Sequence, residues 1–320
     1  MKNKLEISII VPCYNSNNAI LELNTRLINT LNMLNITYEI IYINDSSSDN
    51  TIHTLKNIST QNKQILVIDL MYNVGQFRAI YCGFEHAIGK YVVTLDDDLQ
   101  HPPEEIPKLY NTLKRNENID AIFGKYKIKE HSYFRNLGSS FINFINEKIY
   151  GKPKNLTMSA FRIMKKELVD TILAHKTISP VLGAIILKST NRIINVEVHH
   201  NCRKHGKSNY NLFKLIKATL DNVLNFSSLP LQTISLIGIG VSFISFLFSM
   251  FYLVRYFFTD AGVPGWTSIM VLMNFYAGLI LISLGLIGEY LIRILMEVNG
   301  TPKYIIKKIY TKNILVKKNV

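Results

Sequence analysis

Cysteine is scarce in this sequence, and no two cysteines are close enough to suggest a pair. Cys13, Cys82 and Cys202 are the three among 320 residues, and none lies in a Cys-x-x-Cys motif. This usage is typical of a reducing compartment, so we interpret all three as structural. A signal peptide is also absent, because the apolar run at the N-terminus ends at Pro12 and polar residues follow. We therefore expect the large N-terminal part to stay in the cytosol.

Charge is missing from two long stretches near the C-terminus. Residues 231–258 carry no charge until Arg255, and residues 266–288 carry none at all. A helix needs about 20 apolar residues to cross a bilayer, and both stretches are long enough. A pair of buried core helices is the alternative, but such long charge-free runs are typical of membrane proteins. The sequence thus predicts a transmembrane hairpin over 231–292, with spans at 231–258 and 266–290.

Lysine and arginine are absent from the linker between these spans, residues 259–265, but they are abundant after the second span. The tail beyond Pro302 contains Lys303, Lys307, Lys308, Lys312, Lys317 and Lys318. The positive-inside rule therefore places both ends of the hairpin on the cytoplasmic side. We expect residues 293–320 to form a basic cytosolic tail.

Acidic residues are outnumbered by basic ones, 23 to 36, which gives a net charge of +13. Such an excess is compatible with binding to nucleic acid. In a chain with a membrane hairpin, anionic lipid head groups explain the excess more simply. We therefore expect a membrane as partner, and no nucleic acid.

The first half of the chain alternates short β-rich runs with stretches of helical length, which predicts an α/β fold with a mostly parallel sheet and helices on both faces. Strands are expected at 6–14, 38–45, 65–71 and 91–98, and helices near 18–35, 49–61 and 76–89. Ligands bind such sheets beyond the carboxyl ends of the strands. The polar loops after the first, second and fourth strands should therefore converge on one crevice.

The pattern is less regular after residue 103, where a helix at 103–116 and a strand at 119–124 are expected. We assign residues 1–210 to one cytosolic domain. Residues 212–224 follow with an apolar stripe on one helical face and Lys214, Lys217 and Asp221 on the other. This pattern favours an amphipathic interfacial helix within 211–230, and packing against the soluble domain is a compatible alternative.

Three consecutive aspartates, Asp96, Asp97 and Asp98, end the fourth expected strand. If the strand continues, Asp96 and Asp98 point to one side and Asp97 to the other. Two carboxylates on one side suit Mg²⁺ or Mn²⁺, which in turn can hold a diphosphate. A solvated acidic turn is the alternative, but Asp45 and Asp49 follow an adjacent strand and fall at the same crevice.

Four stretches of the chain carry a resemblance to a known family: "SIIVPCYNSNNAI", "YINDSSSDNT", "NVGQFRAIYCGFEHAIGKYVVTLDDDLQHPPEEIP" and "RKHGKSNYNLFKLI". Together with two membrane helices, they resemble the family 2 inverting glycosyltransferases that load sugars onto polyprenyl phosphate. Dolichyl-phosphate mannose synthases, bactoprenol glucosyltransferases and undecaprenyl-phosphate aminoarabinose transferases belong to this group. The resemblance covers nearly the whole chain.

The resemblance implies a GT-A glycosyltransferase domain that uses Mg²⁺ or Mn²⁺. Its expected reaction moves a sugar from a nucleotide donor, most often UDP-linked, to undecaprenyl phosphate with inversion. The expected place is the cytoplasmic face of the bacterial inner membrane, and the expected purpose is modification of cell-envelope polysaccharide or lipid.

The resemblance also assigns residues, carried over position by position. The metal and diphosphate site would be formed by Asp96, Asp98 and Gln100. The nucleotide sugar would contact Pro12, Tyr14, Asn15, Asp45, Gly75, Gln76 and Asp97, with Asp45 accepting a hydrogen bond from the base. The acceptor and the phosphates would meet Arg135, Arg162, Arg203, Lys207, Ser208 and Tyr210, and the residues implied in catalysis are Asp96, Asp98 and Arg203.

The chain departs from the family pattern at four positions. Asn44 and Ser46 replace an acid and a turn glycine after the second strand, Ala160 replaces an aspartate, and Asn209 replaces a lysine. A sugar hydroxyl acceptor needs a general base as it attacks, whereas a lipid phosphate is already an anion near neutral pH. Loss of the acid at Ala160 is therefore compatible with a phosphate acceptor, whose charge must instead be neutralised by metal and cationic side chains.

Two other functions are weighed against this one. A processive polysaccharide synthase would carry a Gln-x-x-Arg-Trp motif and several spans, but Trp266 is the one tryptophan and lies in the hairpin. A homologue without turnover, binding nucleotide sugar or partners, is the second alternative.

The sequence does not choose between neutral hexose and amino-sugar donors. Small residues in the hairpin, Gly238, Gly240, Gly278 and Gly285, suit a homo-oligomer.

Overall fold

The computed structural model describes residues 5–126, 147, 152–175, 182–199, 265–300 and 302–312, together with single positions between 234 and 254. The chain divides into two compact units. One comprises residues 1–210 and 302–320, and the other comprises residues 211–301. We call the first the catalytic unit and the second the hairpin unit.

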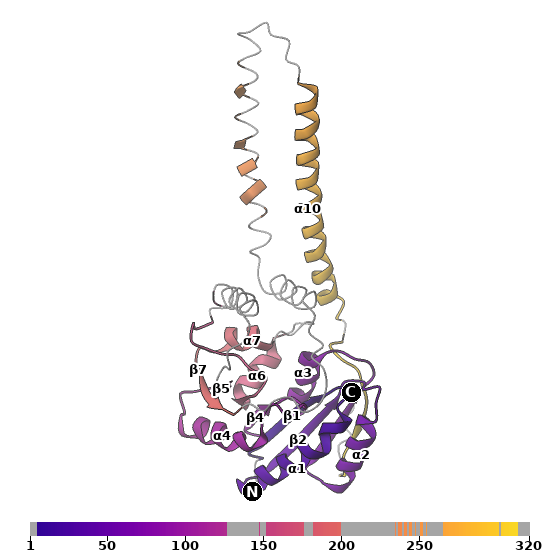
Figure 1. The fold of residues 1–320 in the computed structure, drawn as a ribbon, viewed down its shortest axis with the longest axis vertical. Helices are drawn as coiled ribbons and strands as arrows, with labels where there is room; N and C mark the ends of the chain where they lie inside the picture. The colour runs from indigo at the N-terminus through magenta and orange to yellow at the C-terminus, as the bar shows by residue number, and fades with distance from the viewer. Residues whose placement is uncertain are drawn as a thin grey trace. The chain divides into compact units, whose positions relative to one another are not determined.

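The first part of the catalytic unit is an alternation of strands and helices (Figure 1). Its elements are β1 (Ile7–Cys13), α1 (Asn17–Met33), β2 (Tyr38–Asn44), α2 (Thr51–Gln61), β3 (Ile65–Leu70), α3 (Gln76–His86), β4 (Tyr91–Thr94), the short 3-10 helix η1 (Pro103–Glu105) and α4 (Ile106–Arg115). Each lies where the alternating pattern of the sequence predicts it.

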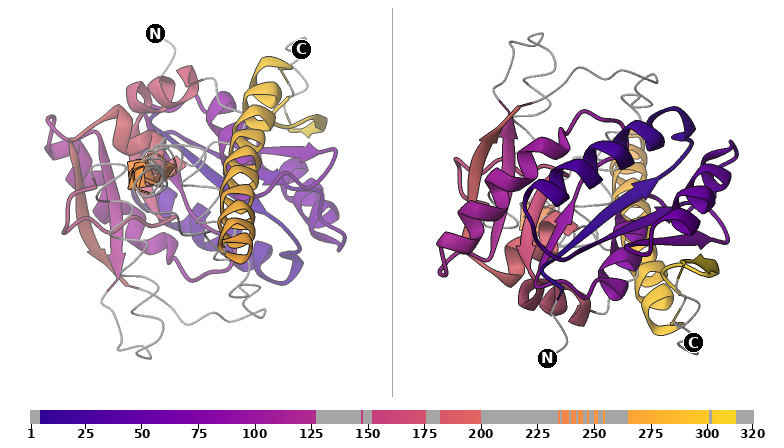
Figure 2. Two further views of the ribbon diagram at one scale, coloured as in Figure 1. Left: turned by 90° about the horizontal axis from the view of Figure 1, so that it is seen from above. Right: turned by 90° about the horizontal axis from the view of Figure 1, so that it is seen from below.

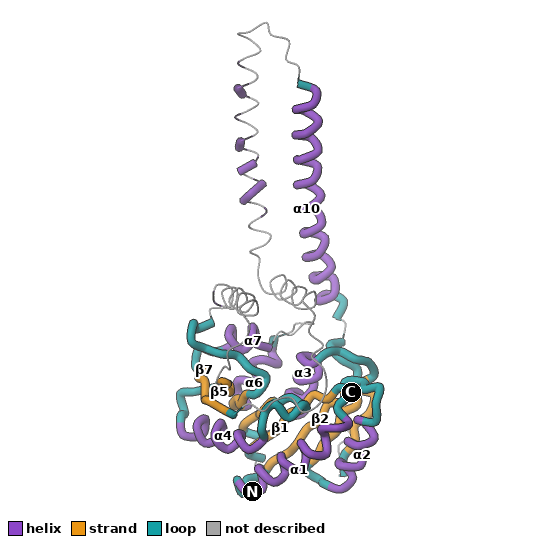
Figure 3. The backbone as a smooth tube through the Cα atoms, in the orientation of Figure 1, coloured by secondary structure: helices purple, strands orange, loops and turns teal. Residues whose placement is uncertain are grey.

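The second part begins after α4, and the tube in Figure 3 shows its helices and strands with the described loops in teal. Its elements are β5 (Ala121–Tyr126), β6 (Arg162–Lys165), α6 (Lys166–Ala174), α7 (Leu182–Ser189), β7 (Ile193–Val198) and, after the hairpin unit, β8 (Ile306–Tyr310).

All eight described strands form one sheet in the order β7-β5-β6-β4-β1-β2-β3-β8. The pairs β1–β2, β1–β4, β2–β3 and β5–β7 are parallel, and β4–β6, β5–β6 and β3–β8 are antiparallel. The expected α/β architecture with a mostly parallel sheet is therefore confirmed. The four parallel strands β3, β2, β1 and β4 lie side by side, so their carboxyl ends share one edge.

Helices cover both faces of this sheet, as the ribbon views show (Figure 2). Alternate residues of β1, Ile7, Ile9 and Val11, are fully buried in a core with α1, α2 and α4. On the other face α3 packs closely, because a Cβ atom added at Gly83 would lie 2.5 Å from Cγ2 of Ile10. Glycine at this position allows α3 to approach the sheet.

Two local expectations need correction or extension. The fourth strand was expected to run to Asp98, but β4 ends at Thr94, so the aspartates lie in a turn rather than on alternating faces of a strand. Part of the expected basic tail is β8, which pairs with β3 at the edge of the sheet through Asp69↔Lys308 and neighbouring positions. Apolar residues at Ile306 and Ile309 alternate with lysines and make this pairing compatible with an exposed edge.

The hairpin unit contains helix α10, Trp266–Val298, which begins where the second span was expected and continues eight residues past its expected end at 290. Among its described side chains, Leu281, Leu284 and Leu295 are more than half exposed. Among the residues that the structure describes, no helix is both long enough and apolar enough to cross a membrane. The first expected span, 231–258, and the interfacial segment 211–230 lie largely outside the described residues.

Candidate active site

A pocket of about 350 Å³ opens at the carboxyl ends of the parallel strands. It is lined by Pro12, Cys13 and Tyr14 after β1, Asp45 after β2, Asn73, Gly75 and Gln76 between β3 and α3, and Asp96, Asp97 and Asp98 after β4. The expected convergence of these loops on one crevice is confirmed. Asn73 and Cys13 also line the pocket, although no sequence signal pointed to them.

Asp45 shapes the pocket through its hydrogen bonds. Its carboxylate accepts the backbone N–H groups of Val74 at 2.7 Å and Gly75 at 2.9 Å. Gly75 has φ +84°, a conformation that glycine adopts without strain. Burial raises the pKa of Asp45, and the two backbone hydrogen bonds oppose this effect. Asp45 thus holds the loop that starts α3, while its hydrogen bond to a nucleotide base remains a prediction.

Asp97 joins the loop after β4 to the loop after β1. Its carboxylate accepts hydrogen bonds from the backbone N–H of Tyr14 at 3.2 Å and from the hydroxyl of Ser16. Burial raises the pKa of Asp97 to about 6, against the lowering effect of these hydrogen bonds. The side chain lines the pocket, but its described hydrogen bonds are structural.

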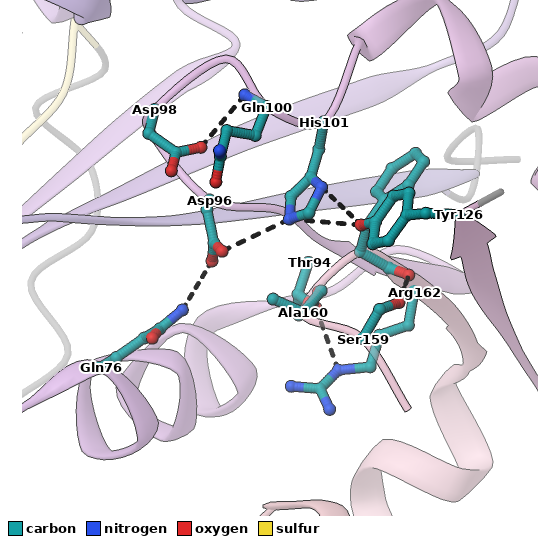
Figure 4. A network of polar contacts seen from close by, with 11 residues as sticks. Gln76, Thr94, Asp96, Asp98, Gln100, His101, Tyr126, Ser159, Ala160 and Arg162 are labelled. Atoms are coloured by element: carbon teal, nitrogen blue, oxygen red, sulfur yellow. Dashed lines mark hydrogen bonds and ion pairs between the residues drawn. The ribbon is translucent and has the colours of Figure 1, made fainter. Parts of the chain in front are cut away.

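Asp96 receives a contact on each of its carboxylate oxygens (Figure 4). Nε2 of Gln76 donates to Oδ1 at 2.6 Å, and Nε2 of His101 lies 3.4 Å from Oδ2. Asp98 accepts the backbone N–H of Gln100 at 3.1 Å, which closes a tight turn in which Leu99 has φ +61°. The turn therefore directs both carboxylates toward one pocket without a continuing strand.

His101 is held in an aromatic stack. The ring of Tyr126 lies 5.4 Å from the imidazole and the ring of Phe161 lies 5.7 Å from it, both nearly parallel to it. The hydroxyl of Tyr126 lies 2.5 Å from Nδ1 of His101. When Tyr126 donates this hydrogen bond, the proton of neutral His101 lies on Nε2 and faces Asp96. His101 is thus a polar partner of Asp96, and Tyr126 is a further participant that the sequence did not reveal.

Arg162 is a buried cation close to this network (Figure 4). Its side chain is 4% exposed, and its Nε donates to Oγ1 of Thr94 at 3.1 Å, which in turn donates to the carbonyl of Ala160 at 2.6 Å. Among the described residues no carboxylate forms an ion pair with Arg162. Burial lowers the pKa of Arg162 to about 10, while Asp96 partly offsets this effect.

The loops after β1 and β2 are tied together by Asn15. Its side-chain oxygen accepts the backbone N–H of Ser48 at 2.8 Å, and its own N–H donates to Ser47. Asp49 was expected near the crevice, but its carboxylate caps α2 by accepting the N–H of Thr51 at 3.0 Å. Asn15 therefore supports the pocket, and Asp49 does not line it.

Several expected site residues lie outside the described residues, namely Arg135, Arg203, Lys207, Ser208 and Tyr210. Within the described part of the chain, no group of three or more His, Cys, Asp or Glu side chains is arranged to hold a metal ion. Asp96 and Asp98, which the sequence predicts as metal ligands, both line the described pocket, together with Asp45 and Asp97.

Residues 8–173, just over half of the chain, match the family described as Glycosyl transferase family 2. Two solved structures of glucosyl-3-phosphoglycerate synthase from Mycobacterium tuberculosis are also similar. One, in complex with Mn²⁺, uridine diphosphate and glucosyl-3-phosphoglycerate, is 16% identical with a TM-score of 0.51, covering 69% of this chain and 78% of that chain. The other, in complex with Mn²⁺, uridine diphosphate and phosphoglyceric acid, has the same identity and TM-score and covers 69% and 76%. At this identity the likeness shows a shared fold.

Proposed function

The chain belongs to glycosyl transferase family 2, and from this premise we propose that it transfers a sugar from a UDP-linked donor to undecaprenyl phosphate. The reaction would invert the anomeric carbon and take place at the cytoplasmic face of the bacterial inner membrane. Nucleotide-sugar transfer follows from the family. The lipid acceptor, the metal and the location are our proposals.

The observation that carries the proposal is the pocket itself. Three polar loops and the first turn of α3 bring Asp45, Gln76, Asp96 and Asp98 to one cavity at the edge where parallel sheets bind ligands. A volume of about 350 Å³ suits part of a nucleotide sugar, since small-molecule pockets span roughly 300–1,000 Å³. Half-exposed Tyr14 offers an aromatic face on the pocket wall.

The residues present fit Mg²⁺ or Mn²⁺. Asp96 and Asp98 supply hard carboxylate oxygens to one pocket, and Mg²⁺ typically uses one or two carboxylates and completes its shell with water and substrate phosphates. Gln100 would support the site from the same turn. A bound cation would neutralise the diphosphate of the leaving nucleotide. The solved glucosyl-3-phosphoglycerate synthase structures contain Mn²⁺ with uridine diphosphate, which supports the same kind of cation here.

The residues of the chain act by binding and orientation. An oxygen of the acceptor phosphate would form a bond to the anomeric carbon from the face opposite the nucleotide, and the bond to the nucleoside diphosphate would break with its electron pair. Asp96, oriented by Gln76 and His101, would hold the donor side. No proton needs to leave the attacking phosphate oxygen, so the reaction requires no general base from the protein.

Arg162 is our candidate for the acceptor side. The described residues around it include Thr94 and Ala160, so a methyl group stands where the resemblance gives many relatives an acid. A buried guanidinium that pairs with no carboxylate among the described residues favours an anionic ligand nearby. Arg135, Arg203, Lys207, Ser208 and Tyr210 remain predicted contacts of the phosphates.

The lipid acceptor is supported by the sequence of the hairpin and tail. The charge-free runs 231–258 and 266–288 are long enough to anchor the chain, and the lysines after Pro302 suit anionic head groups. We propose that the catalytic unit and the tail face the cytoplasm. A homo-oligomer formed through the hairpin is part of the same proposal.

The decisive experiment measures transfer by the purified, detergent-solubilised protein. A panel of nucleotide sugars is offered with undecaprenyl phosphate, with Mg²⁺ or Mn²⁺ and again with EDTA, and Asp98→Asn serves as the inactive control. We expect one donor to give a metal-dependent glycolipid. A parallel reaction with 3-phosphoglycerate tests a soluble acceptor, and product in that reaction alone would overturn the lipid acceptor. Nucleotide binding without any product would favour the homologue without turnover.

A further inference from the structure

The catalytic unit exposes few large apolar side chains, and half of them lie together. Among its described residues, the exposed ones are Tyr14, Leu21, Met33, Met71, Tyr72, Phe77, Ile88 and Ile305. Met71 and Tyr72 follow β3 directly, and Phe77 is the second residue of α3. The N–H of Met71 donates to the carbonyl of Ile305 at 2.9 Å. We call these four residues, Met71, Tyr72, Phe77 and Ile305, the apolar lip.

The apolar lip borders the mouth of the pocket. Asn73, Gly75 and Gln76, which line the pocket, lie in the same short segment as Tyr72 and Phe77. The segment is fixed from below because Asp45 accepts the N–H groups of Val74 and Gly75. The loop that precedes Phe77 is therefore fixed by hydrogen bonds to Asp45.

Few residues separate the lip from α10 along the chain. Helix α10 ends at Val298, four residues before Pro302. Ile305 follows three residues later and is hydrogen-bonded to Met71. The proposed second span would therefore tether the catalytic unit to the membrane through this short connection.

The charge of the same segment is one-sided. Lys303 and Lys307 lie two residues before and two residues after Ile305, and residues 302–312 contain no acidic residue. Lys307 is exposed, whereas Lys312 contacts the carbonyl of Gln61 near the start of β3, away from the lip. Basic side chains near an anionic membrane surface are attracted to its head groups. Exposed aromatic and aliphatic groups beside basic ones are the combination that binds at the interface of a bilayer.

We propose that the apolar lip rests on an anionic lipid bilayer, with Met71, Tyr72, Phe77 and Ile305 at the boundary between head groups and acyl chains, and Lys303 and Lys307 beside Ile305. This inference rests on the proposed function and deepens it. The pocket mouth then faces the bilayer surface, so the phosphate of a long-chain lipid reaches the pocket while its chain stays among other lipids.

The single tryptophan of the chain allows a direct test. In a Trp266→Phe background, Phe77→Trp and Tyr72→Trp place one fluorophore in the lip, and Met33→Trp places it at the last residue of α1. Met33 is 86% exposed and lies toward the edge where the parallel strands begin, opposite the pocket. The full-length variants are reconstituted in vesicles of anionic lipids with brominated acyl chains.

We expect brominated lipids to reduce the tryptophan emission at positions 77 and 72 about twofold, because these side chains would lie at the boundary with the brominated acyl chains. The tryptophan emission at position 33 should be unchanged. Equal emission at 77 with and without bromine, or equal quenching at 77 and 33, would overturn the proposal. Sugar transfer is measured in the same vesicles. Sugar transfer without quenching at residue 77 would overturn the membrane contact of the lip and leave the proposed function standing. Absence of any sugar transfer would count against the proposed function.

Enzyme kinetics provide a second test of the membrane contact, independent of fluorescence. The double variant Met71→Ser/Phe77→Ser should raise KM for undecaprenyl phosphate in vesicles about threefold to tenfold, because it removes apolar groups from the interface. KM for the nucleotide sugar should stay unchanged, and so should both constants in the control Met33→Ser. A rise in the nucleotide-sugar KM alone would show that the lip belongs to the pocket and not to a membrane contact.

Discussion

The two halves of the catalytic sheet serve the pocket in different ways. In the parallel half, β1 to β4, the loops after the strands carry carboxylates, and backbone N–H groups hold three of them, Asp45, Asp97 and Asp98. In the mixed half, β5 to β7, the antiparallel strand β6 and its neighbour β5 bring Arg162 and Tyr126 toward the same site. We call the carboxylates of the parallel half, Asp45 and Asp96 to Asp98, the acidic wall. We call Arg162 and Tyr126 of the mixed half the cationic wall.

This division suits a reaction between two anions. A metal at the acidic wall would take the diphosphate, and the cation of the other wall would take the second phosphate. Asp96 connects the walls, because Gln76 contacts it from α3 and His101 contacts it from the aromatic stack. The variants below change one wall at a time.

The largest effect is expected at the acidic wall. Asp98→Asn keeps an oxygen for the N–H of Gln100 but removes the charge, so turnover should fall at least about 10³-fold through loss of the metal. Titration of Mn²⁺ by calorimetry in the presence of UDP should show weaker binding, with an unchanged melting temperature. The control Asp170→Asn removes an exposed carboxylate of α6 that pairs with Lys166 and should leave turnover intact. Full activity of Asp98→Asn would refute the metal assignment.

The cationic wall should give the next effect. Arg162→Gln removes a buried charge that has no described carboxylate partner, so it should lower kcat/KM for the lipid phosphate about 10- to 100-fold. UDP binding should be unchanged. The melting temperature should not fall, because removing one member of a buried ion pair costs about 3–5 kcal/mol but an unpaired charge has no such penalty.

Arg192→Gln is the matched control for this variant. Arg192 is exposed and forms an ion pair with Asp120, so its loss should leave the acceptor kinetics unchanged. A marked drop in the melting temperature of Arg162→Gln, with normal acceptor kinetics, would make Arg162 a structural ion-pair partner instead.

The link between the walls should give a smaller effect. Tyr126→Phe removes the hydroxyl that lies 2.5 Å from Nδ1 of His101 and so loosens the ring that faces Asp96. We expect Mn²⁺ affinity to fall about threefold to tenfold, less than for loss of a direct partner of a ligand. Tyr38→Phe removes a distant hydroxyl, bonded to Asn32, and should change nothing. Identical Mn²⁺ titrations for the two variants would contradict the role of Tyr126.

The parallel half was predictable because its signals are local. Alternating apolar runs and polar loops fix β1 to β4, and the rule that ligands bind at the carboxyl ends of strands then places Asp45, Gly75, Gln76 and Asp96 to Asp98 together. What the sequence missed is the turn after Thr94. The i, i+2 argument assumed a continuing strand, whereas the N–H of Gln100 bonds Asp98 and closes a turn.

The mixed half was less predictable because its contacts are distant in sequence. Tyr126 meets His101 25 residues away, and Arg162 reaches Thr94 across 68 residues, and no periodicity encodes either contact. Strand β8 is a third case. Its lysine-rich sequence resembles a tail, and its pairing with β3 more than 230 residues earlier depends on an open sheet edge that only the folded structure displays.

The smallest effect is expected away from both walls, at Glu39 on β2. Its Oε1 accepts hydrogen bonds from Ser8 and from the N–H of Ile88 at 2.9 Å, and burial raises its pKa in spite of these bonds and of nearby Lys166 and His86. A carboxyl whose folded pKa is raised favours folding most below its unfolded pKa. This contribution is lost as pH rises through the raised value.

Glu39→Gln keeps the accepting oxygen and cannot ionise, so its melting temperature should match the parent at pH 4 and exceed it by about 2 °C or less at pH 7.5. Thermal melts of both proteins from pH 4 to 8 check this, and parallel curves would show that Glu39 does not titrate with a raised pKa. Turnover at pH 7.5 should be the same for both, because Glu39 lies near the starts of β1 and β4 and the pocket lies at their ends.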